Sequence, residues 1–397
     1  MLIASRGMAL AGFFLLPSIT NANDFKQYVL YFAVWQFCSQ LLSMQLGTTF
    51  FRCGLNSAFT KNLHCLLSVF YPLLFLALLA FISTLSSANI IVSAFFMSVI
   101  VAVFIVVSEY ARAKINERLV FCIYMLPGLL YLTLFAFSKY LELELSLSQL
   151  LFSEAITYAI MTMLLLVKCE VKISWSSVKL IKSIKRVLPF WYRISFPLIP
   201  NNLLWYFYFN VPIVIGYRLI TDVQDYNEMA LLFRFVVAIS TVSSLLALVF
   251  QKRIVNTFEH NKRSYGKIKH AFLTLFIPSF FVVSIIGYFV FESIARVVKL
   301  SVSCGVCDVA FNNVAVFIFL FYMFFSIYLM SHYFVAEKNL TIISPSMFIG
   351  FVVYVLSVLV GLNLGFSFSL ISIYSLCISL TITFIIRYFW SLKQEKI

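Results

Sequence analysis

Residues 194–217 read ISFPLIPNNLLWYFYFNVPIVIGY, a stretch of 24 residues without Asp, Glu, Lys or Arg. About 20 mostly apolar residues in helical form cross the hydrocarbon core of a bilayer, so this stretch predicts a transmembrane helix. Long apolar runs favour helices, because a transmembrane barrel would show short alternating segments. Working outward, the chain predicts an all-α integral membrane protein of about 12 transmembrane helices, the others lying near residues 2–20, 27–50, 63–84, 90–108, 119–138, 147–167, 229–250, 271–291, 312–335, 343–362 and 368–388.

The composition supports this interpretation. The chain has 397 residues, of which 62% are apolar and 11% are charged, whereas a soluble chain is about half apolar and about a quarter charged. Twelve spans would use roughly 240 residues and leave short loops. That leaves no room for a globular catalytic or nucleic-acid-binding domain, so we assign the net charge of +14 to loops beside lipid.

The distribution of charge predicts an orientation. With the N-terminus inside, the predicted cytoplasmic segments hold 23 of the 29 Lys and Arg residues and the outer loops hold five, with Arg234 inside a span. Positive residues accumulate on the cytoplasmic side of membrane proteins. Both termini are therefore predicted to be cytoplasmic.

A basic segment at residues 168–193 holds seven Lys and Arg residues and one acid. We interpret it as a cytoplasmic linker that rests on anionic lipid headgroups. It divides the chain into a predicted N-terminal six-helix bundle, residues 1–167, and a predicted C-terminal six-helix bundle, residues 194–397.

The two halves show a weak internal repeat. Asp24 and Phe25, before the second span, align at a spacing of 201 with Asp225 and Tyr226 before the eighth, and the same spacing places Arg52 on Arg253. Two copies with six spans each have the same orientation in the membrane and face one another across a cavity, which is typical of alternating-access transporters. The spacing also predicts a first helix truncated at its start.

Two stretches carry a family resemblance. Residues 197–202, PLIPNN, followed by 213–217, IVIGY, resemble the start of the second half of bacterial polysaccharide flippases, and residues 46–52, LGTTFFR, are similar to the end of that family's second helix. The resemblance is to the Wzx-type O-antigen flippases of the multidrug/oligosaccharidyl-lipid/polysaccharide (MOP, MATE-like) exporter superfamily. Lys26 and Asn227 stand where that family has Gly.

The resemblance implies a multi-pass protein of the bacterial inner membrane with two MATE-like bundles. It implies a transporter without cofactor that moves undecaprenyl-diphosphate-linked O-antigen or other polysaccharide repeat units to the outer leaflet for lipopolysaccharide or surface polysaccharide biosynthesis. The implied partners are this lipid-linked oligosaccharide, membrane lipids, and the polymerase and chain-length machinery. A drug or small-solute exporter of the same superfamily is the alternative, followed by an O-antigen polymerase, which usually needs large basic periplasmic loops.

Charged side chains at membrane depth are costly and are functional candidates. Arg52, Arg193 and Arg234 are candidates to hold a diphosphate, and the alternative is snorkelling to the interface. Arg234 is predicted about 8 Å inside the outer end of its span. Glu154 is the candidate for ion coupling, against a structural ion pair with Arg234 or a solvated position near the outer surface.

Two polar stripes suggest a cavity. Gln36, Ser39, Gln40 and Ser43 recur at helical spacing on the second span, which predicts cavity lining or interhelical hydrogen bonds. On the seventh span the candidates are Asn201 and Asn202 together with Trp205 and Tyr208, whose rings suit stacking on sugars or an aromatic belt.

Prolines and cysteines complete the candidates. Pro17 in the first span, and Pro197, Pro200 and Pro212 in the seventh, are predicted hinges, with static kinks as the alternative. Cys304 and Cys307 lie in a predicted outer loop and predict a local disulfide. No metal site is expected, because no second Cys pair or His lies at a suitable spacing.

Overall fold

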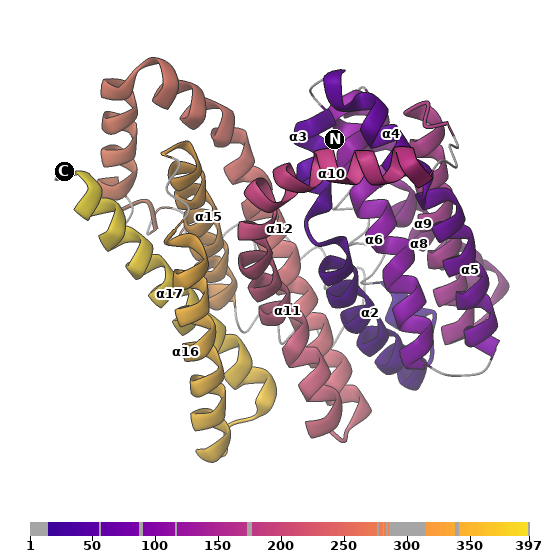
Figure 1. Cartoon of the computed structure of the whole chain (residues 1–397). Coiled ribbons are helices and arrows are strands. Elements are labelled where there is room, and N and C mark those ends of the chain that lie inside the picture. Colours follow the sequence, from indigo (N-terminus) through magenta and orange to yellow (C-terminus); the bar gives the residue numbers. More distant parts are fainter. Residues whose placement is uncertain are drawn as a thin grey trace. The chain divides into compact units, whose positions relative to one another are not determined.

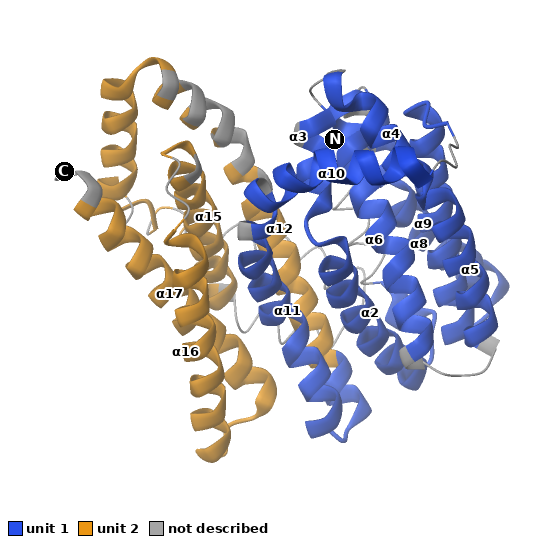
Figure 2. Cartoon of the chain, in the orientation of Figure 1, with its two compact units in different colours: residues 1–227 blue, residues 228–397 orange. Residues whose placement is uncertain are grey.

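The computed structural model forms two compact units, residues 1–227 and residues 228–397 (Figure 2), and each is described here by itself. The described residues are 15–54, 57–86, 90–115, 117–172, 177–275, 278–280, 282, 285, 314–337 and 341–395. These units follow the contacts within the chain, and the division into two six-helix bundles around residues 168–193 stays a prediction.

The secondary structure described in unit 1 consists of helices joined by short turns and loops (Figure 1). α2 packs against α6 and α11, and α6 packs in turn against α3, α5 and α9. The elements are η1 (Leu16–Ser18), α2 (Ala22–Ser43), α3 (Leu46–Gly54), η2 (Ser57–Phe59), α4 (Thr60–Ser68), α5 (Phe70–Ser86), α6 (Ile90–Lys114), α7 (Glu117–Tyr124), α8 (Leu126–Leu141), α9 (Leu147–Lys168), α10 (Ser177–Ile194), η3 (Phe196–Leu198) and α11 (Ile199–Leu219).

Unit 2 contains most of α12 (Val223–His260), a helical stretch at residues 262–275, α15 (Val314–Ala336), α16 (Ile343–Asn363) and α17 (Phe368–Glu395). α17 packs along both α16 and α15. At Gly361 a Cβ atom would come within 2.1 Å of the Ile371 side chain, so glycine is required for this close approach of α16 to α17.

Among the described residues, seven helices are long and apolar enough to cross a membrane. They are Thr60–Leu85, Val92–Lys114, Cys122–Leu141, Leu147–Lys168, Ala315–Phe334, Ile343–Asn363 and Phe368–Lys393. The predicted all-α, multi-span class is confirmed. The first and ninth predicted spans lie largely outside the described residues.

The predicted span at residues 27–50 is divided, which corrects the sequence prediction. Met44 and Gln45 adopt φ angles of +44° and +55° between α2 and α3. Such left-handed residues end a helix. The indole of Trp191, on α10, donates a hydrogen bond of 2.8 Å to the carbonyl of Met44. This distant side chain thus satisfies a carbonyl that the break removes from the helical ladder.

The segment interpreted as a linker loop contains an 18-residue helix, α10. In Figure 1 this helix crosses the end of unit 1, where it packs against α4 and also contacts α3 and η3. It buries Ser183 and Val187, while Val178, Ile181 and Leu188 are more than half exposed beside several lysines. A basic helix with exposed apolar side chains suits the surface of a membrane. The sequence predicts Arg193 at the start of the seventh span. In the structure it lies in the last turn of α10 instead.

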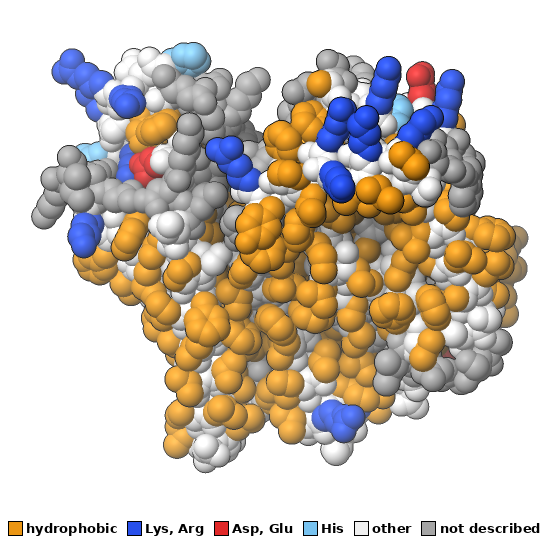
Figure 3. Space-filling view, viewed as in Figure 1, with side chains coloured by type: hydrophobic (Ala, Val, Ile, Leu, Met, Phe, Trp, Pro, Cys, Tyr) orange, Lys and Arg blue, Asp and Glu red, His pale blue; other side chains and the backbone are white. Residues whose placement is uncertain are grey.

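Basic side chains gather at one end of unit 1. In Figure 3 they lie over α3, α4 and α10, above a flank of apolar side chains. The ammonium of Lys114, at the end of α6, donates to Thr60 Oγ1 at 2.9 Å at the start of α4. This arrangement agrees with the charge asymmetry of the sequence, and which end faces the cytoplasm stays a prediction.

The spacing of 201 recurs in the helix starts. α2 begins at Ala22 and α12 at Val223. Asn21 Oδ1 accepts from the backbone N–H of Asp24 at 2.7 Å, and Asp222 Oδ1 accepts from that of Asp225 at 3.0 Å. Both side chains cap a helix N-terminus in the same way. The predicted repeat is therefore present here, although α12 continues unbroken where its counterpart α2 ends.

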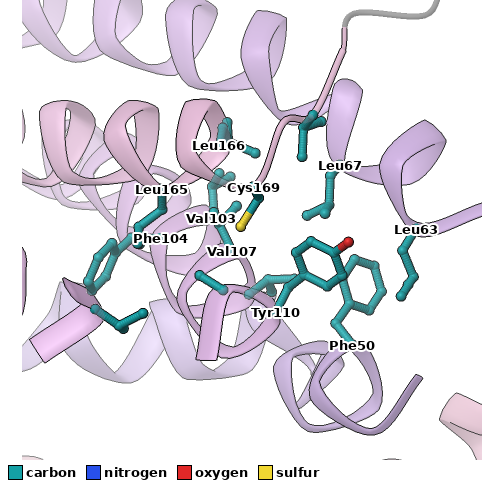
Figure 4. Close-up of a cluster of buried hydrophobic side chains, with 14 of the residues drawn as sticks. Phe50, Leu63, Leu67, Val103, Phe104, Val107, Tyr110, Leu165, Leu166 and Cys169 are labelled. Carbon is teal, nitrogen blue, oxygen red and sulfur yellow. The ribbon is translucent and has the colours of Figure 1, made fainter. Parts of the chain in front are cut away.

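The core of unit 1 lies between α3, α4, α6 and α9 (Figure 4). Phe50, Leu63, Val107, Tyr110 and Leu165 are at most 3% exposed. Cys169, directly after α9, packs in the same cluster. Its environment offers few polar groups to a charged sulfur.

We expect the Cys169 thiol to be inert in the folded protein. Burial raises the pKa of this thiol to about 12, against a smaller opposing effect of Lys114. The nucleophilic thiolate is then scarce at pH 7–8. In a variant with Cys169 as its sole cysteine, maleimide should react at least about a hundredfold more slowly before denaturation than after it. Mass spectrometry measures this, and equal rates would contradict the buried placement.

Candidate functional site

A polar cavity of about 430 Å³ lies within unit 1. It is lined by residues of α2, α3, α6, α7, α9 and α11 and by the break between α2 and α3. Amide and hydroxyl groups predominate among the polar lining side chains: Gln36, Ser39, Gln40, Ser43, Gln45, Thr48, Ser108, Tyr124, Tyr158, Asn202 and Tyr206.

The α2 stripe predicted from the sequence lines this cavity. Ser39 and Ser43 donate to the carbonyls of Gln36 and Gln40 on their own helix, at 2.8 and 2.9 Å. The serines thus use their donors within α2 and do not join helices through them. The amides of Gln36 and Gln40 lie at the cavity, where an amide offers both donors and an acceptor to a ligand.

On α11 the residues that line the cavity lie one position after Asn201 and Trp205 of the predicted stripe. Asn202 and Tyr206 line the cavity. Trp205 is 9% exposed and stacks on Phe209, with ring centroids 6.0 Å apart, and Tyr208 is fully buried. α11 has polar residues on more than one face, so its sequence alone left the choice open.

Aromatic rings form one wall of the cavity. Tyr158 is contacted edge-on by Trp35 and by Phe104, with centroids 5.9 and 5.4 Å away. Tyr124 contacts Phe104 at 5.4 Å and donates its hydroxyl to Ser108 at 2.8 Å. These edge-to-face contacts hold rigid ring surfaces beside the amides.

Glu109 is the one charged residue among the described side chains that line the cavity. It forms an ion pair with Arg112 at 2.8 Å, and the Arg112 guanidinium lies 5.5 Å from the Phe51 ring centroid. A Cβ atom at Gly47 would be 2.9 Å from Glu109 Cγ, so Gly47 allows α3 to approach α6 here. The sequence analysis missed Glu109 because it lies among residues assigned to a cytoplasmic segment.

Arg193 and Arg234 are not among the described residues that line this cavity. The side chain of Arg52 lies outside the described residues, and that of Arg193 is exposed on α10. Arg234 is 3% exposed and lies in unit 2. Because α12 begins at Val223, Arg234 is about 17 Å along the helix from its start, and its depth in the membrane stays a prediction.

Glu154 lies in a buried cluster beside α2 and α8. It is 3% exposed, which excludes the solvated position considered for it. The Tyr28 hydroxyl donates to Glu154 Oε1 at 2.6 Å, and the Tyr131 hydroxyl donates to the same oxygen. The two hydroxyls are 2.9 Å apart. A carboxyl whose donors come from two other helices can change its affinity for a proton when those helices move.

The predicted hinge prolines lie at different kinds of position. Pro17 is in η1 and Pro197 is in η3, Pro200 is in the first turn of α11, and Pro212 is inside α11. Hinging at these residues stays a prediction. Cys304 and Cys307, with their predicted disulfide, lie outside the described residues.

Unit 2 contains a buried arginine, Arg387, which lies at the end of the predicted span 368–388 and is one of the 23 Lys and Arg residues counted above as cytoplasmic. Arg387 is 1% exposed inside α17. It donates to Ser331 Oγ and the Ile327 carbonyl of α15 at 2.6 and 3.1 Å, and to Ser346 Oγ and the Ile343 carbonyl of α16 at 2.9 and 3.1 Å. It extends a buried polar stripe along α17 formed by Ser372, Ser375, Ser379 and Thr383.

A second cavity, of about 370 Å³, lies in unit 2 and is mainly apolar. Its lining includes Phe250, Phe272, Phe325, Leu329 and Tyr333. Beside it, Lys269 and Tyr265 both donate to Glu337 Oε1 at 2.7 Å. Hydrocarbon is the ligand chemistry that such a lining suits.

No protein-family model and no curated protein matches the chain. Solved structures are similar over nearly its whole length. An outward-facing multidrug resistance MATE family transporter of the MOP superfamily has a TM-score of 0.58 at 13% identity, over 99% of this chain and 93% of that one. The eukaryotic MATE transporter AtDTX14 has a TM-score of 0.51 at 11% identity, over 98% of this chain and 90% of that one.

A MOP superfamily transporter from Pyrococcus furiosus, described as having a binding pocket of reverse polarity, has a TM-score of 0.52 at 12% identity, over 99% of this chain and 93% of that one. The chain therefore has the fold of MATE transporters of the MOP superfamily.

Proposed function

We propose that the protein is a flippase that moves undecaprenyl-diphosphate-linked O-antigen or other polysaccharide repeat units across the bacterial inner membrane by alternating access. The observation that carries this proposal is the partly open polar cavity between helices of unit 1, in a chain with the fold of MATE transporters. Its amides and hydroxyls suit the hydroxyl groups of a sugar, and its ring wall suits the apolar face of a sugar ring.

The proposal assigns the sugar, rather than the diphosphate, to this cavity. None of its described lining residues is Lys or Arg, and its one carboxylate, Glu109, is paired with Arg112, so the described lining offers no cationic side chain to a diphosphate. The apolar cavity of unit 2 has the chemistry that a prenyl chain requires. Transport of this kind breaks no covalent bond, so the protein would act without catalytic residues or a cofactor.

A drug or small-solute exporter is the second candidate. Glu109 beside the Trp35, Phe104 and Tyr158 rings favours it, because carboxylates and ring faces attract cations. Efflux of a cationic dye from cells that express the chain, together with unchanged surface polysaccharide after gene deletion, would support this candidate over the flippase.

The flippase proposal predicts a deletion phenotype. Removing the gene should abolish surface polymer while lipid-linked single repeat units accumulate inside the cell. Restoring the gene with both Gln36→Ala and Gln40→Ala should return less than about a tenth of the polymer, because two amide partners are lost. The matched control is Gln224→Ala, whose side chain is exposed at the start of α12. Normal polymer in the deletion strain, without a second flippase, would contradict the proposal.

A further inference from the structure

The N-terminal end of α2 contacts the end of α11, the start of α12 and the segment between them. The Lys26 ammonium lies 5.2 Å from the ring centroids of both Tyr217 and Tyr226 and donates to the Ile220 carbonyl at 3.3 Å. In the opposite direction, the Asn227 amide donates to the Ala22 carbonyl at 3.1 Å. All of these residues belong to unit 1.

The two donors occupy equivalent places in the repeat. Position 227 follows position 26 by 201 residues, the spacing that also relates the starts of α2 and α12 and their two capping side chains. Lys26 and Asn227 are thus both the fifth residue of their helix, and each contacts the segment of the other copy. The contact is therefore reciprocal: each copy of the repeat supplies one donor to the other copy.

The local chemistry favours a cation at position 26. Tyr226 is fully buried and contacts the Tyr217 ring edge-on, with centroids 5.7 Å apart, so the two rings form a fixed aromatic corner. A cation over ring faces is more strongly held where water is excluded. Ile220 is the C-cap of α11, so the ammonium also lies at the negative end of that helix dipole.

We propose that Lys26 and Asn227 form a reciprocal latch that closes this end of the transporter and opens in each transport cycle. The latch rests on the proposed transport function, because it assigns a closed state to a protein that alternates. It lies about 15 Å along α2 from Gln36, whose side chain lines the polar cavity. By the charge asymmetry of the sequence, this end faces outward.

Accessibility of a cavity cysteine tests the latch. In a cysteine-free parent with Gln36→Cys, the combined change Lys26→Ala and Asn227→Ala should speed labelling by a membrane-impermeant maleimide from outside intact cells. We expect about a three- to tenfold increase, because losing these contacts raises the share of the open state. Inside-out vesicles should show no such increase.

Two variants serve as controls. Lys26→Arg keeps a cation over the rings and should label at the parental rate, and Lys139→Ala removes an exposed lysine of unit 1 and should also leave the rate unchanged. Equal labelling of the parent and the Lys26→Ala, Asn227→Ala variant would overturn the latch. If that variant fails to reach the membrane, Tyr217→Leu replaces it under the same criteria. Labelling needs no substrate, so a faster rate without any effect of the gene on surface polysaccharide would uphold the latch and refute the flippase.

Discussion

Replacing Arg387 by Ala is expected to lower the free energy of unfolding by about 3 kcal/mol, because four hydrogen bonds to two neighbouring helices are lost and a cavity remains. The Arg387 guanidinium, on α17, donates hydrogen bonds to both α15 and α16. No smaller side chain spans both partners. The melting temperature of the detergent-purified protein should fall by roughly 3–5 °C.

Three variants separate the causes of this loss. Lys393→Ala removes an exposed cation from the same helix and should leave the melting temperature unchanged. Arg387→Met fills the space without hydrogen bonds, and Arg387→Lys keeps the charge without the planar fork of donors. Both should have intermediate stability. If Arg387→Ala and Lys393→Ala melt at the same temperature, the hydrogen bonds of Arg387 do not stabilise the protein.

The second large effect is expected at Glu154. Glu154→Gln keeps an oxygen acceptor for the Tyr28 and Tyr131 hydroxyls but cannot ionise. If Glu154 carries the coupling proton, this variant should lose more than about tenfold of its polysaccharide export while its melting temperature stays close to that of the parent. Glu154→Ala should lose both export and stability, because the two buried hydroxyls then have no carboxylate to bind.

The matched control for this experiment is Glu144→Gln, an acid exposed between α8 and α9. Export is measured as surface polymer in a deletion strain, with and without an uncoupler that collapses the proton gradient. Full export by Glu154→Gln would assign the cluster to helix packing. Export by the parent that an uncoupler leaves unchanged would exclude proton coupling altogether.

The fold class could be predicted because the bilayer imposes its own length on each apolar run. The stretches from Leu147 to Lys168 and from Ile343 to Asn363 were located to within a few residues by this criterion alone. The break at Met44 could not be predicted. The carbonyl of Met44 accepts a hydrogen bond from Trp191, 147 residues further along the chain, and no local pattern indicates this partner.

The candidate site could be predicted only in part, because some of its features depend on local spacing and others on contacts between distant helices. A stripe on one helix, such as Gln36 and Gln40, is visible in sequence because it depends on spacing alone. The partners of Glu154 belong to two other helices, and no local pattern indicates them. Arg387 was counted as cytoplasmic because it stands at the end of an apolar run, and its buried partners lie on two other helices that no local pattern indicates.

α2 and α11, which supply amide groups to the polar cavity, are not among the seven described helices that are apolar enough to span a membrane by themselves. Their prolines, asparagines and glutamines make them poor substrates for direct partition from the translocon into lipid. We therefore expect both helices to enter the bilayer late in biosynthesis, sheltered by partners such as α6. The same side chains that give the cavity its chemistry would then set the order in which the nascent protein is assembled.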